Sequence, residues 1–112
     1  MLQKEHRLRH DKDIKALFQK AKSVFDVYCG LKYKKNNLNV SRFAVVVGVK
    51  VSKKAVTRNR LRRQIISTIY KHLDEIKPGY DVIILVRKEA VGKKTEELAE
   101  HILSALKKAG LF

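Results

Sequence analysis

Two short and almost uninterrupted apolar runs constrain the fold of this chain most. Residues 43–51 (F-A-V-V-V-G-V-K-V) and residues 80–86 (Y-D-V-I-I-L-V) each have the length of a strand. Continuous apolar strands are typical of a sheet that is covered on both faces, so we expect residues 43–51 to form a central strand. Between the two runs, apolar residues recur at helical spacing, which predicts a helix that packs inward. Its inward residues are Leu61, Ile65, Ile69, Leu73 and Ile76.

The remaining sequence predicts two further helices and the rest of the sheet. Residues 11–21 show helical spacing of apolar side chains, and residues 95–109 do the same. Residues 24–33, rich in Val, Phe and Tyr, indicate a strand, and Asn36-Asn37 indicates a turn, so a hairpin is expected there. The predicted order is therefore α-β-β-β-α-β-α: an α+β sandwich with a four-stranded mixed sheet that the helices must cover.

The length and composition restrict the class of protein. A chain of 112 residues supports one modest core, so residues 1–112 are predicted to form a single domain. No run approaches the roughly 18–20 apolar residues of a membrane span, and the first residues lack the apolar centre of a signal peptide. Cys29 is the only cysteine, which excludes an internal disulfide and favours a reducing, cytoplasmic location.

The charge is large and unevenly distributed. The chain has 26 Lys and Arg against 11 Asp and Glu, a formal net charge of +15. Residues 1–64 contain 18 basic and 4 acidic groups, whereas residues 65–112 contain 8 and 7. Such asymmetry is typical of a protein that binds a polyanion, most simply a nucleic acid.

A basic run, residues 50–64 (K-V-S-K-K-A-V-T-R-N-R-L-R-R-Q), concentrates this charge where the long helix is expected to begin. A helix N-terminus already carries about half a positive charge, so basic residues there are unfavourable unless an anion binds. The final helix follows the opposite, stabilising rule, with Glu96 and Glu97 at its start and Lys107 and Lys108 at its end. We therefore expect the basic run to bind phosphates.

Helical spacing groups the members of this run. Arg58 and Arg62 are i,i+4 neighbours, as are Asn59 and Arg63, and guanidinium groups bind phosphate bidentately. The candidate RNA-binding residues are Lys53, Lys54, Arg58, Asn59, Arg60, Arg62 and Arg63. The acidic residues are scattered, whereas hydrolysis by two metal ions needs clustered carboxylates. We predict neither a catalytic residue nor a metal ligand in the protein.

The segment V-S-K-K-A-V-T-R-N-R-L-R-R resembles the signature of the bacterial ribonuclease P protein subunit. The likeness extends along nearly the whole chain, through Arg7-Leu8, residues 13–18 and the segment D-V-I-I-L-V-R-K at residues 81–88. One departure is that Lys54 joins Ala55 directly, where the family usually has a short Gly-containing segment. The loop before the helix should therefore be tighter.

The resemblance implies a function. In that family the holoenzyme removes the 5′ leader of precursor transfer RNA, and catalysis resides in an RNA component that holds Mg²⁺. The protein docks on that RNA through the Arg58-Asn59-Arg60 helix. The expected partners are thus the catalytic RNA and precursor transfer RNA, with no obligate protein partner and no membrane. The family fold also has a left-handed β-α-β crossover, against the usual preference.

The resemblance further implies a cleft between the first helix and the sheet that holds the single-stranded leader. Its expected residues here are Phe18, Ile14 (where the family commonly has an aromatic), Arg87, Lys88 and one tyrosine, either Tyr28 or Tyr33. Aromatic rings beside basic side chains suit this ligand, because bases stack on aromatic rings with little sequence preference.

Two other classes of protein share part of this pattern. A ribosomal-type or general RNA-binding protein would have the basic helix but would not need Phe18, Arg87 or Lys88 to be exposed. A DNA-binding protein is less well supported, because no helix-turn-helix pair frames the basic helix.

Overall fold

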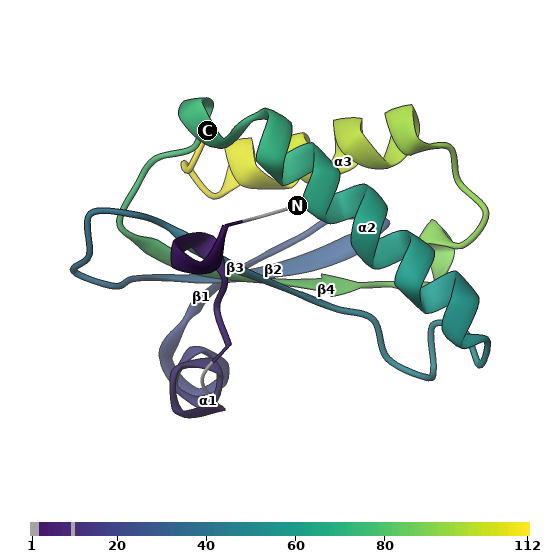
Figure 1. Ribbon diagram of the computed structural model, residues 1–112, viewed down its shortest axis with the longest axis horizontal. Coiled ribbons are helices and arrows are strands. Elements are labelled where there is room, and N and C mark those ends of the chain that lie inside the picture. The colour runs from purple at the N-terminus through teal and green to yellow at the C-terminus, as the bar shows by residue number, and fades with distance from the viewer. Residues whose placement is uncertain (1–2, 10) are drawn as a thin grey trace.

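The computed structural model of the protein, which describes residues 3–9 and 11–112, has one four-stranded sheet between two helical layers (Figure 1). The strands are β1 (Lys22–Phe25), β2 (Cys29–Lys35), β3 (Arg42–Val46) and β4 (Tyr80–Val86). The helices are α1 (Asp11–Lys20), α2 (Ala55–Lys71) and α3 (Thr95–Lys108), with 3₁₀ turns η1 (Lys4–His6), η2 (Leu73–Glu75) and η3 (Lys88–Ala90). The predicted order of helices and strands and the mixed sheet are confirmed.

The strand order is β1-β2-β4-β3, with β3 and β4 parallel and the other neighbours antiparallel. This order corrects three details of the prediction. Residues 24–33 form both strands of the β1–β2 hairpin and not one strand. The turn at Asn36-Asn37 exists, with Asn37 at φ 62°, but it closes no hairpin because β4 lies between β2 and β3. Residues 43–51 supply only β3, an edge strand that ends at Val46.

The free edge of β3 is partly covered by the N-terminal segment. Arg7 bridges to Phe43 in parallel, and the Leu8 N–H donates to the Phe43 carbonyl at 2.9 Å. An unpaired strand edge would otherwise expose backbone donors and acceptors. The apolar character of β3 therefore reflects the helices packed on its faces and not a central position in the sheet.

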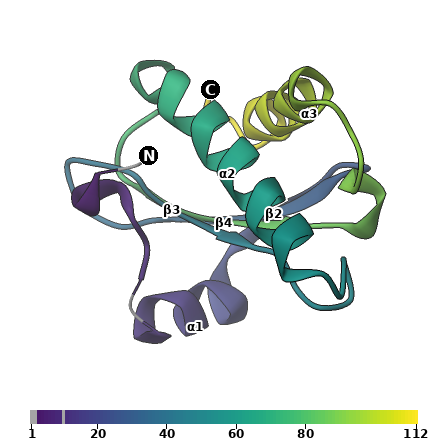
Figure 2. The ribbon, with the colours of Figure 1, turned by 45° about the vertical axis from the view of Figure 1, so that its right-hand side comes forward.

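Helices cover both faces of the sheet (Figure 2). The larger core lies under α2 and α3, where Leu61, Ile65 and Ile69 meet Val82 and Ile84 of β4. The smaller core lies under α1 and consists of Leu8, Leu17 and Ile83. Neighbouring residues of β4 thus point to opposite layers, which is why this strand is apolar at almost every position.

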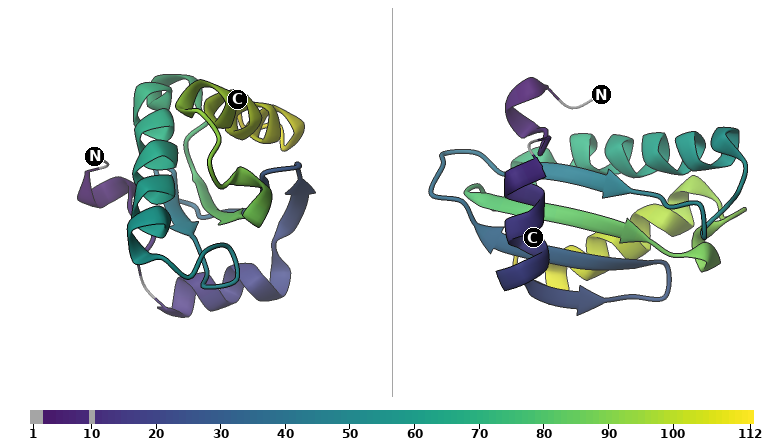
Figure 3. Two further views of the ribbon diagram at one scale, coloured as in Figure 1. Left: turned by 90° about the vertical axis from the view of Figure 1, so that its right-hand side faces the viewer. Right: turned by 90° about the horizontal axis from the view of Figure 1, so that it is seen from below.

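The connection from β3 through α2 to β4 joins two adjacent parallel strands. Seen from the α1 side, α2 lies behind the sheet and the crossover is left-handed (Figure 3, right). Most such connections have the opposite hand. The hand expected from the family resemblance is therefore present.

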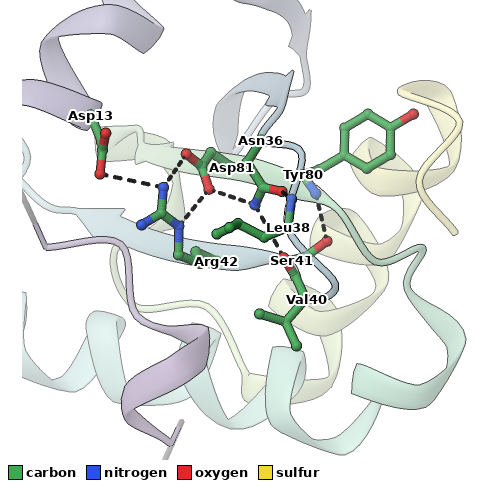
Figure 4. A network of polar contacts seen from close by, with 8 residues as sticks. All are labelled: Asp13, Asn36, Leu38, Val40, Ser41, Arg42, Tyr80 and Asp81. Carbon is green, nitrogen blue, oxygen red and sulfur yellow. Dashed lines mark hydrogen bonds and ion pairs between the residues drawn. The ribbon is translucent and has the colours of Figure 1, made fainter.

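A polar network fixes the start of α1 to the sheet (Figure 4). Arg42 donates from Nε and Nη2 to the two carboxylate oxygens of Asp81 at 2.8 and 2.7 Å, and Nη2 lies 3.3 Å from Asp13 of α1. Asn36 donates to the same Asp81 at 2.9 Å and to the Val40 carbonyl at 3.1 Å. These bonds satisfy a buried carboxylate and set the position of α1 over the sheet.

Candidate nucleic-acid interface

The basic run forms the loop before α2 and the first half of that helix. Ala55 begins the helix, and its first turn contains no acidic residue. The side chains of Lys53, Lys54, Asn59, Arg60 and Arg63 are exposed, whereas Arg58 and Arg62 are half-buried. The seven predicted RNA-binding residues therefore share one end of the molecule.

Two of the arginines also hold local structure. Arg58 Nη1 donates to the Ser52 carbonyl at 2.9 Å, which ties the loop before α2 to the helix. Arg62 Nη1 donates to Asn59 Oδ1 at 2.6 Å. The guanidinium groups of Arg58 and Arg62 are thus oriented before any ligand binds, which lowers the entropy cost of binding one.

Among the described residues, no acidic side chain neutralises this surface. Within residues 3–9 and 11–112, none of the six basic groups in the predicted site forms an ion pair, and Arg60 and Arg63 make no side-chain hydrogen bond. Arg60, Arg62 and Arg63 lie beyond the first turn, where the helix dipole has largely faded. The main unfavourable interaction at this surface is therefore the repulsion between the cations and not their interaction with the helix dipole. A bound polyanion would relieve this repulsion.

A surface with a different composition, here called the α1 surface, lies on the opposite face of the sheet, beside α1. Phe18 on α1 is 49% exposed, although its neighbour Leu17 is buried. The Lys32 ammonium of β2 lies 5.8 Å from the centroid of the Phe18 ring and 3.4 Å from Ser23 Oγ. Ile14 is half-buried against the small core. Phe18 therefore presents an aromatic face beside a cation, as the sequence predicted for this residue.

Arg87 and Lys88 follow β4 at one end of the α1 surface. The Arg87 N–H donates to the Tyr28 carbonyl at 2.9 Å and its backbone is extended. Strand alternation therefore continues, and Arg87 falls on the α1 face with Leu85. Both Arg87 and Lys88 are exposed, and the one partner of Arg87 among the described side chains is Glu89, at 3.8 Å. The structure brings Arg87, Phe18 and Ile14 to one face.

The prediction that Tyr28 or Tyr33 lies on the α1 surface is wrong. Tyr33 shares the face of Leu31, beneath α2 and α3, where its ring lies 6.5 Å from that of Tyr80. Tyr28 lies in the β1–β2 turn and its hydroxyl donates to Glu97 of α3 at 2.6 Å. That bond raises the pKa of Tyr28. Period-two alternation along β2 puts Tyr33 away from α1, whereas Tyr28 lies in the turn before β2 and is placed on the α3 side by its bond to Glu97.

The sequence analysis missed Lys32 and Phe25, which lie on the α1 face instead. Phe25 is 68% exposed, and a Cβ atom on Gly30 would lie 3.5 Å from its ring. Gly30 and Lys32 are two residues apart on β2, so they share a face. Recognising the turn at residues 26–28 would have fixed this register.

The groups typical of protein-based catalysis are dispersed. In the described part of the chain, no three His, Cys, Asp or Glu side chains gather as metal ligands. Cys29 is buried, and this burial raises its thiol pKa to about 12, so it is not a nucleophile at neutral pH. None of the described helices is long and apolar enough to span a bilayer.

The fold and its surfaces define a class: a small α+β domain with a cationic helix on one side of the sheet, uncompensated among the described residues, and exposed aromatic side chains on the other. The chain belongs to the ribonuclease P protein family, whose sequence pattern it matches over residues 2–110. Membership makes it a protein component of bacterial ribonuclease P, and hence a subunit of a ribonuclease.

Relatives in sequence and in structure agree with this assignment. The ribonuclease P protein component of Clostridium botulinum (strain Loch Maree) is 33% identical over 110 residues, 97% of this chain and 98% of that protein. That of Synechocystis is 33% identical over 121 residues, 99% of this chain and 90% of that protein. The RNase P protein of Thermotoga maritima superposes with a TM-score of 0.84 at 28% identity, covering 91% and 96% of the two chains. The Staphylococcus aureus protein reaches 0.88 at 24% identity, covering 96% and 97%, which bears on the fold alone.

Proposed function

We propose that the protein binds the catalytic RNA of ribonuclease P through α2 and the 5′ leader of precursor transfer RNA through the α1 surface. In this way it promotes the Mg²⁺-dependent removal of the leader to give the mature 5′ end. The observation that carries this proposal is the separation of two unlike surfaces by the sheet: cations without acidic partners on one side, exposed aromatic rings on the other, among the described residues.

The α2 surface suits a folded RNA. Its cations are fixed on a rigid helix, and two of them are pre-oriented by bonds to Ser52 and Asn59. Phosphate contacts of this kind give affinity without sequence preference, because every nucleotide carries the same charge. The amide of Asn59 adds a contact to a 2′-hydroxyl or a base edge.

The α1 surface suits a single RNA strand of variable sequence. Every base has an aromatic face that stacks on a ring such as Phe18. Lys32, whose ammonium lies 5.8 Å from that ring, and the exposed Arg87 supply cations for the backbone. A leader whose sequence differs between transfer RNAs requires this sequence-tolerant mode of binding. The cytoplasm, where transfer RNA is processed in bacteria, is the proposed location.

The chemistry of hydrolysis we assign to the RNA component and its Mg²⁺ ions. The described carboxylates do not form the clustered set that two-metal hydrolysis requires. The protein therefore contributes affinity and positioning, so its effect should be largest when Mg²⁺ is scarce and the RNA alone binds substrate weakly. No further protein subunit is needed for this role.

Reconstitution tests the proposal. Purified protein is mixed with its cognate catalytic RNA and a precursor transfer RNA at low Mg²⁺, and formation of the mature 5′ end is measured. We expect a rate above that of the RNA alone, with Phe18→Ala weakening precursor binding more than mature transfer RNA binding. No gain in 5′ maturation from the folded wild-type protein would overturn the proposal.

A further inference from the structure

The α1 face of the sheet contains a row of residues that no helix fully covers. Strand pairing aligns Val46 of β3 with Leu85 of β4, Leu85 with Gly30 of β2, and Gly30 with Phe25 of β1. The row is therefore apolar across all four strands. Its two ends are open: Val46 is 39% exposed and Phe25 is 68% exposed.

This apolar row (Val46, Leu85, Gly30 and Phe25) lies between two cationic positions. On one side is the next row on this face, with Lys32 opposite Ser23, where the Lys32 ammonium approaches the Phe18 ring. On the other side is Arg87, one alternation beyond Leu85. Neighbouring rows on one face are about 7 Å apart. The row thus ends at the Phe25 ring, with Lys32 and the Phe18 ring on one side of it and Arg87 on the other.

Packing within the protein does not account for the exposure of Phe25. Its ring covers the glycine beside it, because a Cβ atom on Gly30 would lie 3.5 Å from Cδ1 and Cε1. Such cover stabilises a strand pair, but it leaves the outer face of the ring in water. An exposed aromatic ring contiguous with other apolar surface and flanked by cations is typical of a binding site for unpaired nucleotides.

We propose that Phe25 is a second stacking platform for the single-stranded leader, distinct from Phe18, and that the outer face of its ring, which covers Gly30, receives the base. This inference rests on the proposed function and adds a residue to it. Phe18 and Phe25 then hold different nucleotides of the same leader, while Lys32 and Arg87 bind the phosphates on either side.

Fluorescence can test this directly, because the chain contains no tryptophan. Single-tryptophan variants Phe25→Trp and Phe18→Trp are assembled with the catalytic RNA, and Tyr70→Trp, at an exposed site on α2, is the control. Each complex then receives a precursor transfer RNA with a non-hydrolysable bond at the cleavage site, or mature transfer RNA. We expect indole emission at positions 25 and 18 to be quenched by the precursor and not by mature transfer RNA, and Tyr70→Trp to respond equally to both.

Binding affinity for the precursor distinguishes a stacking role of Phe25 from a purely structural role in covering Gly30. Phe25→Leu keeps an apolar side chain over Gly30 but removes the aromatic face, whereas Phe25→Tyr keeps both. We expect Phe25→Leu to weaken precursor binding about five-fold or more, with mature transfer RNA binding unchanged, and Phe25→Tyr to behave as wild type. Equal losses for both RNAs, or a loss matched by a lower unfolding free energy in both variants, would mean that Phe25 serves the sheet alone.

The remaining outcomes are also decisive. Quenching at position 25 by the catalytic RNA alone would assign the ring to that RNA and overturn the inference. A response at position 18 without one at position 25 would overturn the inference and leave the proposed function intact. If neither position responds and the wild-type protein does not promote 5′ maturation, the proposed function itself fails.

Discussion

Asp81 is a buried charged residue, only 8% exposed, and two residues bind its carboxylate. Arg42 binds both oxygens, Asn36 donates a further bond, and Asp13 shares the Arg42 guanidinium from α1. The hydrogen bond to Asp81 is the main cause that raises the pKa of Arg42, so the guanidinium stays charged. A carboxylate buried at this depth is tolerated only with such partners.

Arg42→Ala should therefore destabilise the fold by about 2–3 kcal/mol, since it leaves a buried charge without its main partner. Urea unfolding followed by circular dichroism measures this free energy. Adding Asp81→Asn should recover part of the loss because the unpaired charge is gone. Lys71→Ala, at an exposed site on α2, is the control and should change the free energy by less than about 0.5 kcal/mol. If Arg42→Ala left the free energy of unfolding unchanged, the network would not contribute to stability.

Cys29 gives a second prediction at this scale. Burial raises its thiol pKa from 9.0 to about 12, so the folded state favours the protonated thiol. The stability from this group is complete below pH 9 and is lost as the pH rises from about 9 towards 12. At pH 8 the folded protein should react with iodoacetamide on the order of a thousand times more slowly than the urea-unfolded protein, as three pKa units imply. Mass spectrometry of timed samples measures this, and similar rates in both states would contradict the buried position.

At the scale of the element, α2 combines a structural face with a cationic one. Leu61, Ile65 and Ile69 pack on the sheet, and the opposite side carries Arg60 and Arg63 without partners among the described residues. The hydrophobic face therefore fixes the direction in which the cations point. The preceding loop is short and is tied to the helix by Arg58, so removing Arg58 changes structure as well as charge.

Arg60 and Arg63 are consequently the better probes of RNA binding. Replacing either with Ala should lower the slope of log affinity against log salt by about 0.7–0.9 for each phosphate that the variant no longer binds, with the unfolding free energy little changed. Filter binding of the catalytic RNA between low and moderate salt measures this slope. Lys71→Ala removes the same charge from the far end of the same helix and should leave the slope nearly unaltered. If Arg60, Arg63 and Lys71 gave equal changes, α2 would contribute only a diffuse positive field.

At the scale of the whole molecule, the sheet separates the two proposed RNA surfaces. The α2 cations and the α1 surface lie on opposite sides of the sheet and share no side-chain contact in the described structure. Sites that share no partners make additive contributions to binding.

The double variant Arg60→Ala with Phe18→Ala should therefore weaken precursor binding to the assembled enzyme by the sum of the two single effects, within about 0.5 kcal/mol. Equilibrium binding of the four proteins to a non-cleavable precursor completes the cycle. Coupling well above that value would mean that the two surfaces grip one continuous RNA element, contrary to the proposed division.

Several parts of this architecture could be predicted from sequence because they depend on local rules. The helical spacing of Leu61, Ile65 and Ile69 and the apolar run at residues 80–86 appear in the structure where they were expected. The exposure of Phe18 and Arg87 agrees with the family resemblance. The errors arose where pairing partners matter: one strand was predicted for the β1–β2 hairpin, and one tyrosine, either Tyr28 or Tyr33, was expected on the α1 face.

The sequence by itself determined the elements, the inward faces of the helices and the position of the cationic run, since each follows from residues a few positions apart. Only the tertiary structure decided which strand is central, which face each β2 side chain joins, and the left-handed crossover. Strand order and register depend on contacts between distant segments, and a shift of one residue moves every side chain to the other face. For this reason Phe25 and Lys32 lie on the α1 surface and Tyr33 lies on the other side of the sheet. Tyr28, in the β1–β2 turn, also lies on that other side.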